Sequence, residues 1–143
     1  MAFENPSQEK IFDYLKTAKN IAVVGLSNKT DRTSYKVAEV LQENGYRILP
    51  VNPILAGQEI LNEKVYEKLT DITEPIDIVD VFRRSEFLPE VAEEFLKTDA
   101  KVFWAQLGLE NEEAAELLKA AGRNDIVMDR CIKIELGKLK DKS

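Results

Sequence analysis

The chain has 143 residues, of which 44% are hydrophobic and 32% charged, a composition typical of one compact globular domain. Its formal net charge of −6 argues against binding to nucleic acids. The chain has no histidine and a single cysteine, Cys131, so histidine-based catalysis and an internal disulfide are excluded and a metal site is not expected. The apolar runs are shorter than the ~18 residues of a membrane span, and we expect a cytoplasmic protein without membrane contacts.

The first third of the chain alternates between helical and extended patterns. Apolar residues at helical spacing after Ser7 predict a helix that ends near Ala18. A continuous apolar run then predicts a strand over residues 20–25, buried on both faces. A helix over residues 35–44 and a second strand over residues 46–51 follow.

The rest of the chain continues this alternation after a less regular middle stretch. In that stretch we expect a short extended piece at residues 58–61 and one or two helical turns at residues 65–69. The tail after Leu136 is basic and is expected to fray. The remaining predicted elements are strands over residues 76–82, 101–108 and 126–129 and helices over residues 85–97 and 111–121.

Alternating strands and helices predict an α/β fold. Right-handed crossovers between parallel strands give a doubly wound sheet with helices on both faces. With the five strands numbered along the chain, we expect the order 3-2-1-4-5. The whole chain then forms a single domain, with a core over about residues 7–136 and a basic C-terminal tail.

Arginines gather where the predicted strands end. Four of the six arginines, Arg32, Arg83, Arg84 and Arg130, directly follow a strand, and the carboxyl ends of parallel strands share one edge of the sheet. Guanidinium groups match the oxygens of phosphate, so this edge is a candidate phosphate site. The alternative for each arginine is an ion pair with a surface carboxylate such as Glu86 or Asp129.

The loop after the first strand is the second indication of phosphate binding. Gly25 permits a tight turn, Thr33 or Ser34 can cap the next helix, and Lys29 adds positive charge near the exposed N–H groups of that helix. The loop lacks the further glycines of a dinucleotide fingerprint, and no Gly-Lys-Ser/Thr follows. The second strand ends in Asn52 without the acidic residue that usually holds the ribose of NAD, so NAD is disfavoured.

Several spaced motifs of this chain resemble a known family. The chain resembles the stand-alone CoA-binding domain proteins of bacteria (the YccU-like proteins) over about residues 7–136, and it is similar to the CoA-binding domain of the succinyl-CoA synthetase α subunit. The resemblance implies a Rossmann-like fold that holds coenzyme A, or an acyl-CoA, at the strand ends. The motifs are VVGLS at 23–27, RTSY at 32–35, VNP at 51–53, VDVFR at 79–83, WAQLG at 104–108 and VMDRC at 127–131.

The resemblance also implies roles for particular residues. Gly25, Ser27 and residues 32–35 are expected to contact the diphosphate and the neighbouring phosphate. Asn52 and Pro53 line the nucleotide side. Phe82 and Arg83 flank the adenine or pantetheine, and Gln106 and Gly108 face the thiol end. The complete set of expected CoA-binding residues is Gly25, Ser27, Asn28, Lys29, Arg32, Thr33, Ser34, Tyr35, Asn52, Pro53, Phe82, Arg83, Gln106, Gly108 and Arg130.

The expected function is a non-catalytic binding, carrier or sensor module for CoA. The synthetases use a phosphorylated histidine, which this chain lacks, so their activity does not transfer. The alternatives are an NAD(P)- or other nucleotide-binding protein and an enzyme acting on CoA thioesters through Ser27, Tyr35 or Cys131. We assign no catalytic residue.

Two further features have competing interpretations. Cys131 follows the fifth strand, where it is either a small buried apolar residue or a thiol that forms a mixed disulfide with CoA. Asp77 and Asp80 share one strand, but residues three apart point to opposite faces, so a catalytic carboxylate pair is not expected.

Overall fold

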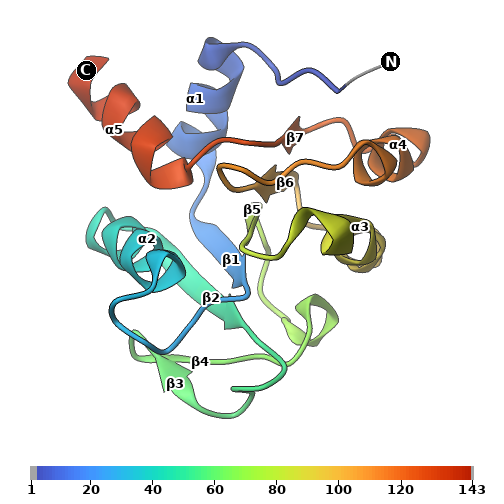
Figure 1. Cartoon of the computed structure of the whole chain (residues 1–143). Coiled ribbons are helices and arrows are strands. Elements are labelled where there is room, and N and C mark those ends of the chain that lie inside the picture. Colours follow the sequence, from blue (N-terminus) through green and yellow to red (C-terminus); the bar gives the residue numbers. More distant parts are fainter. Residues whose placement is uncertain (1–2, 143) are drawn as a thin grey trace.

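A computed structural model describes residues 3–142. The chain forms a five-stranded parallel sheet with α-helices on both faces (Figure 1), as the alternating pattern predicts. The strands are β1 (Asn20–Val24), β2 (Arg47–Val51), β5 (Ile78–Val81), β6 (Val102–Ala105) and β7 (Ile126–Val127). The helices are α1 (Gln8–Thr17), α2 (Thr33–Glu43), α3 (Leu88–Leu96), α4 (Glu112–Ala120) and α5 (Ile132–Lys142).

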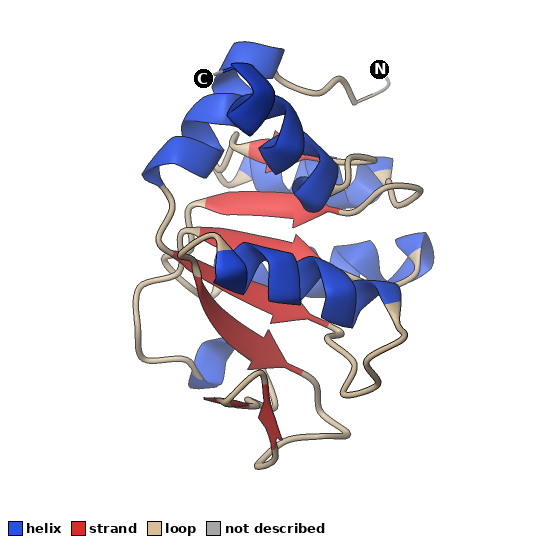
Figure 2. Cartoon of the chain, turned by 90° about the vertical axis from the view of Figure 1, so that its left-hand side faces the viewer, coloured by secondary structure: helices blue, strands red, loops and turns tan. Residues whose placement is uncertain are grey.

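Two apolar clusters cover the two faces of the sheet. Successive side chains of β1 alternate between them, so Ile21 and Val23 pack with α1, α2 and α5, whereas Ala22 and Val24 pack with α3 and α4. Figure 2 shows helices in front of the strands and behind them, with the strand arrows pointing to one edge. The chain is therefore a doubly wound α/β domain whose carboxyl strand ends share that edge.

The predicted strand order is wrong. The order is β2-β1-β5-β6-β7, so the third long strand lies between the first and the fourth instead of outside the second. The segment between β2 and β5 contains no α-helix, and it passes β1 so that β5 pairs with the other side of that strand. The outer side of β2 is taken by Tyr66, whose N–H donates to the Pro50 carbonyl (2.9 Å) and whose carbonyl accepts from Asn52 N–H (2.9 Å). The result is the other common order of doubly wound sheets.

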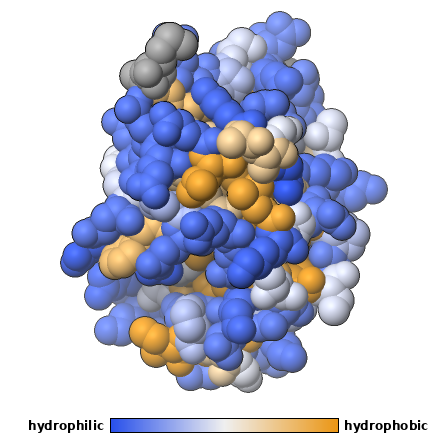
Figure 3. Space-filling model, turned by 90° about the vertical axis from the view of Figure 1, so that its right-hand side faces the viewer, coloured by the Kyte–Doolittle hydropathy of each residue, from blue (hydrophilic) through white to orange (hydrophobic). Residues whose placement is uncertain are grey.

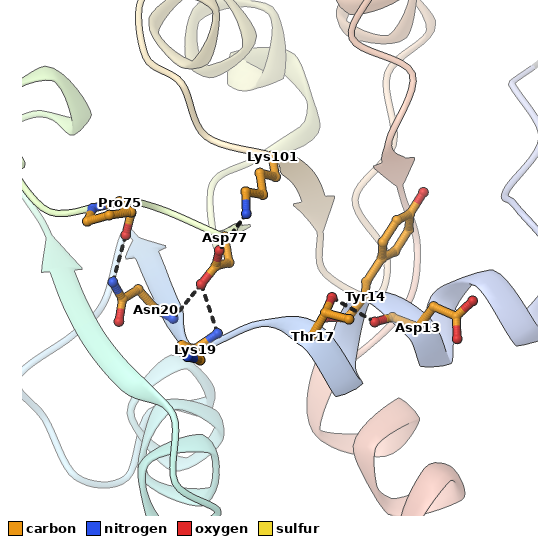
Figure 4. Close-up of polar contacts among 8 residues, drawn as sticks. All are labelled: Asp13, Tyr14, Thr17, Lys19, Asn20, Pro75, Asp77 and Lys101. Atoms are coloured by element: carbon orange, nitrogen blue, oxygen red, sulfur yellow. Dashed lines mark hydrogen bonds and ion pairs between the residues drawn. The ribbon is translucent and has the colours of Figure 1, made fainter.

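Asp77 fixes β5 beside β1 at the amino end of the sheet (Figure 4). Its N–H donates to the Asn20 carbonyl (3.0 Å), and its carboxylate accepts from the N–H groups of Lys19 (2.8 Å) and Asn20 (2.9 Å). The Lys101 ammonium lies 3.5 Å from the other carboxylate oxygen. Burial alone would raise the pKa of Asp77, but these N–H groups and Lys101 hold it below its usual value.

The middle stretch and the C-terminal tail differ from expectation. Residues 65–69 do not form a helical turn, because Tyr66 bridges the edge of β2 and a 3-10 turn comes only at Leu69–Asp71. Two-residue strands, β3 (Glu59–Ile60) and β4 (Glu63–Lys64), form a small hairpin before it. The basic tail is helical up to Lys142 instead of frayed, since α5 packs on α1 and Gln8 Nε2 donates to the buried Glu135 carboxylate (2.6 Å).

Figure 3 shows the side of the molecule that carries α3 and α4. Hydrophilic residues cover most of this side, and apolar surface gathers near its middle. The partly buried residues Leu96 and Leu109 pack against the core cluster beneath these helices. Within residues 3–142, no helix has the length and apolarity that a membrane span requires.

Candidate functional site

The strand order changes direction between β1 and β5, which lead to helices on opposite faces of the sheet. Ligands of doubly wound sheets bind at such a point, beyond the carboxyl ends of the strands. An open hollow of about 380 Å³ lies here, and we call it the β1–α2 hollow. Its lining residues are Gly25, Ser27, Lys29, Arg32, Thr33, Ser34 and Phe82.

Gly25 allows the ends of β1 and β5 to approach each other. Its φ is +86°, a value that disfavours other residues, and a Cβ atom here would collide with the carbonyl oxygen of Phe82. The Gly25 N–H donates to the Val51 carbonyl (2.8 Å), and Phe82 N–H donates to the Val24 carbonyl (2.8 Å). The turn is thus held by β2 on one side and β5 on the other.

The N-terminus of α2 opens onto this hollow without a side-chain cap. The N-cap residue is Arg32, whose side chain accepts no hydrogen bond, and the first turn contains no acidic residue. The prediction that Thr33 or Ser34 caps this helix is wrong, because both lie inside its first turn. The buried Ser34 hydroxyl instead accepts from Ser27 N–H (3.0 Å) and shapes the loop. Uncapped N–H groups at a helix start are suited to an anion.

The cations at the hollow have no carboxylate partner. Within residues 3–142, no ion pair involves Lys29, Arg32 or Arg83, and the Arg83 guanidinium lies 4.7 Å from the Phe87 ring centre. Arg84 does pair with Glu86 (3.7 Å), as the alternative interpretation of the arginines anticipated. Lys29 and Arg32 line the hollow and bring positive charge to the exposed helix start, whereas Arg83 does not line it.

Some predicted site residues hold the loops rather than line the hollow. Asn52 Nδ2 donates to the Leu26 carbonyl (3.0 Å) and its Oδ1 accepts from Ile54 N–H (2.9 Å), so both ends of its amide are used. Pro53 is exposed next to it. Asn28 is exposed in the loop after β1, whereas Tyr35 packs against the core under α2. The hollow therefore brings together seven of the fifteen predicted residues.

Gln106, Gly108 and Arg130 lie farther along the same edge, at the β6–β7 corner. The buried Gln106 accepts from Ile132 N–H (3.1 Å) at the start of α5, and Gly108 N–H donates to the Asp129 carboxylate (2.7 Å). Arg130 donates to the carbonyl of Asp129 (3.0 Å), not to its carboxylate. None of the three predicted residues lines the β1–α2 hollow.

Two exposed apolar residues on the carboxyl-end loops are not among the predicted site residues. Ile54, after β2, is 88% exposed, and Leu107, after β6, is 62% exposed. The sequence feature that could have indicated them is a large aliphatic residue just beyond a strand end, where polar turn residues are expected. Within the described residues, no group of histidine, cysteine, aspartate and glutamate side chains could hold a metal ion.

Comparison with known proteins identifies relatives over most of the chain. A family model described as a CoA binding domain matches residues 19–137. An uncharacterized protein of Bacillus subtilis, YneT, is 56% identical over 131 residues, which cover 92% of this chain and 95% of YneT. The alpha subunit of an ADP-forming acetate–CoA ligase of Pyrococcus furiosus is 30% identical over 116 residues, which cover 73% of this chain but 25% of that subunit.

Solved structures share the fold over nearly the full length. A Thermus thermophilus protein, cell-free ID.343, superposes with a TM-score of 0.89 at 37% identity, covering 94% of this chain and 99% of its own. A hypothetical protein from Pyrococcus horikoshii superposes with a TM-score of 0.88 at 35% identity, covering 98% and 99%. These relatives are small proteins of about the same extent as this chain.

Proposed function

The chain belongs to the family of CoA binding domains, and from this premise we propose that it binds coenzyme A or an acyl-CoA with the diphosphate in the β1–α2 hollow. The observation that carries this proposal is the uncapped N-terminus of α2, with Lys29 and Arg32 beside it and no acidic residue in its first turn. A phosphate oxygen supplies the acceptors that these N–H groups lack.

Hydrogen bonds from charged groups, together with apolar contacts, are expected to support a micromolar affinity for CoA. A hydrogen bond to a charged group contributes about 1.5–3 kcal/mol, and a micromolar dissociation constant corresponds to about −8 kcal/mol. Two or three such bonds contribute about 3–9 kcal/mol, and apolar contacts to the pantetheine arm are needed to offset the entropy cost of binding. We expect Arg83, which stacks on Phe87 just after β5, to add a further contact along the ligand.

We propose a binding, carrier or sensor role in the cytoplasm rather than catalysis in this hollow. The chain has no histidine. The Ser27 hydroxyl accepts from Lys29 N–H (3.0 Å), and no basic side chain of the described residues bonds to it. The match covers only 25% of the ligase subunit, so its activity is not carried over.

NAD(P) and other nucleotides are the competing ligands. Asn52 stands where a ribose-binding acid is common, and its amide is already engaged by Leu26 and Ile54. This arrangement favours CoA over NAD.

Calorimetric titration of the protein with CoA tests the proposal. We expect Arg32→Ala to weaken binding about 10- to 100-fold, the loss of one charge-assisted hydrogen bond. Arg47→Ala is the matched control, because Arg47 lies at the amino end of β2 and pairs with Glu63 (3.6 Å) and Glu74 (3.1 Å). Absence of CoA binding, or tighter binding of NAD or ATP, would contradict the proposal. Equal affinities of the two variants would remove Arg32 from the phosphate site.

A further inference from the structure

Asp80 is a fully buried acid without a partner. It lies in β5 with 0% exposure, and neither oxygen of its carboxyl group has a hydrogen-bond partner among residues 3–142. No ion pair in this part of the chain includes it either. Buried polar groups in folded proteins are normally hydrogen-bonded, so a group that is not calls for an explanation.

The neighbouring acid Asp77, just before β5, lies in very different surroundings. Its carboxylate accepts from the N–H groups of Lys19 (2.8 Å) and Asn20 (2.9 Å), and the Lys101 ammonium lies 3.5 Å from it. These contacts stabilise the ionised form of Asp77. Asp80 has no such contact, so its surroundings favour the neutral form.

Apolar strand residues flank Asp80 in the sheet. β5 lies between β1 and β6 (Figure 1), and Asp80 lies opposite Val23 and Trp104 in the register of these strands. Both neighbours belong to the apolar cluster under α1, α2 and α5, and so does Ile78, two residues before Asp80. Because side chains alternate along a strand, Asp80 points into this cluster.

The polar side chains at the end of β6 are engaged elsewhere. Trp104 Nε1 donates to the Arg130 carbonyl (2.8 Å), and the Gln106 side-chain oxygen accepts from Ile132 N–H (3.1 Å). These bonds fix the segment before α5 over the sheet. They leave Asp80 among packed apolar groups without a hydrogen bond.

Other titratable groups also reach this layer, and none of them bonds to Asp80. Tyr14 donates to Asp125 (2.8 Å) and Tyr46 to the Leu15 carbonyl (2.6 Å). Burial raises the pKa of both phenols, so they stay neutral when pH reaches the ordinary value of about 10. The remaining groups are Tyr35 of α2, the half-buried Cys131 before α5, and Glu135 of α5, whose carboxylate accepts from Gln8 and Lys138. The other charged residues of α1, α2 and α5 are exposed.

These surroundings make ionisation of Asp80 costly in the folded chain. A carboxylate among apolar side chains loses its hydration and gains no partner in return. Burial therefore raises the pKa of Asp80 well above its usual value. In the unfolded chain the side chain is hydrated and titrates near the ordinary value, about 3.9. Between these two values the folded state binds one proton more than the unfolded state.

We propose that Asp80 is a proton switch in the core, neutral in the packed sheet, and that release of its proton as pH rises loosens the layer between the sheet and α1, α2 and α5. The switch adjoins the β1–α2 hollow, because Gly25 and Phe82, which line it, lie two residues beyond Val23 and Asp80. A disturbed pairing of β1 and β5 at Asp80 therefore reaches this turn directly. The proposal does not depend on which ligand the hollow binds.

Trp104 provides a direct probe of Asp80, because it is the single tryptophan of the chain, is fully buried and lies opposite Asp80. A base titration of the full-length protein, followed by tryptophan emission, tests the proposal. We expect a reversible one-proton change of emission in the wild type and in Asp99→Asn, a control at an exposed acid. We expect no such change in Asp80→Asn or Asp80→Val. The same change in these two variants would overturn the proposal, because another group would then be its source.

Urea denaturation at a series of pH values measures the linkage to folding. The folding constant of the wild type, divided by that of Asp80→Asn, should fall about tenfold per pH unit above the unfolded pKa and become level above the folded pKa. The same ratio for wild type and Asp99→Asn should stay constant. A constant ratio for Asp80→Asn would overturn the proposal, because Asp80 would then be ionised in the folded state.

The infrared spectrum of the wild type at neutral pH provides a test that needs no variant to fold. We expect the carbonyl band of a protonated carboxylic acid, since the other acids of the protein are ionised at this pH. The band should be absent from Asp80→Val where that variant folds. A wild-type spectrum without the band would overturn the proposal.

Discussion

The charged side chains named at the two ends of the parallel sheet differ in whether they form ion pairs. At the amino end, Asp77 accepts two backbone N–H groups and pairs with Lys101 (Figure 4), and Arg47 pairs with two glutamates. At the carboxyl end, Lys29 and Arg32 have no ion-pair partner within residues 3–142, beside a helix start that lacks a cap. Paired charges join strands and loops, whereas unpaired charges around exposed N–H groups remain available to a ligand.

A second helix start shows that the difference is local. The N-terminus of α4 is capped by Asn111, whose side chain accepts from Ala114 N–H (2.9 Å), and its first turn contains Glu112 and Glu113. These acidic residues already complement the helix dipole, so an added anion would be repelled. Of these two helices, α2 has the N-terminus that is suited to phosphate.

The largest effect is expected from Gly25→Ala at the carboxyl end. The added Cβ requires a strained backbone and displaces Phe82, which lowers the free energy of unfolding by about 2–4 kcal/mol. Gly57→Ala is the matched control, since Gly57 also has a positive φ (+89°) but no atom within 4 Å of an added Cβ. Urea denaturation of both variants measures the difference. Equal losses would mean that the close approach of β1 and β5 contributes nothing.

An acidic residue in the first turn of α2, as in α4, is expected to make the N-terminus of α2 unsuitable for an anion. Thr33→Glu places a carboxylate at the hollow, and CoA affinity should fall about 10- to 100-fold because like charges repel and the N–H groups gain an internal partner. The folded state should gain up to about 1 kcal/mol from the helix dipole. Thr73→Glu at the amino end adds the same charge and is expected to leave calorimetric affinity unchanged.

Asp77→Ala tests the amino end, where stability rather than affinity should respond. Removing the carboxylate leaves the N–H groups of Lys19 and Asn20 without their acceptor and should cost about 1–2 kcal/mol of unfolding free energy. The lowered pKa of Asp77 means that its contribution is fully present above the unfolded pKa and is lost as pH falls through the folded pKa. Acid titration followed by circular dichroism should show this loss in the wild type and in Asp99→Ala, but not in Asp77→Ala.

The smallest effect is expected from Lys29→Ala. The side chain is exposed, so its interaction with a phosphate is screened and should amount to less than about 1 kcal/mol. Titration with CoA at low ionic strength should show a two- to fivefold weaker affinity, and the difference should vanish at high salt. Lys16→Ala on α1 is the control with the same change of net charge. A salt-independent loss would indicate a direct, desolvated contact.

The sequence was sufficient for the alternation of strands and helices, because buried parallel strands appear as uninterrupted apolar runs such as that of β1. It was not sufficient for their order. The order depends on Tyr66, which pairs with β2 although the segment around it shows no clear periodicity. It also depends on the hydrogen bonds of Asp77 with Asn20 and Lys19, which lie 57 and 58 positions earlier in the chain. Neither contact leaves a local pattern in the chain.

In the candidate site, too, the sequence predicts local features but not contacts between distant residues. The glycine turn and the cationic loop after β1 are local features, and the sequence predicted that Gly25, Lys29 and Arg32 would be near one another. Gln106 instead forms its hydrogen bond with Ile132, 26 residues away, and so supports α5 rather than lining the hollow. Among residues 3–142 the buried Asp80 carboxyl group has no hydrogen-bond partner, and this state depends on every side chain around it, which single-residue propensities do not describe.

The edge strands of the sheet affect whether the protein aggregates at high concentration. Exposed strand edges are templates on which other chains add, the first step of aggregation. At the β2 border, Tyr66 already uses the backbone groups of Pro50 and Asn52, and the opposite border, β7, is two residues long. Each border therefore offers an incoming strand too short a ladder for stable addition, which should keep concentrated solutions of this protein free of fibrous assemblies.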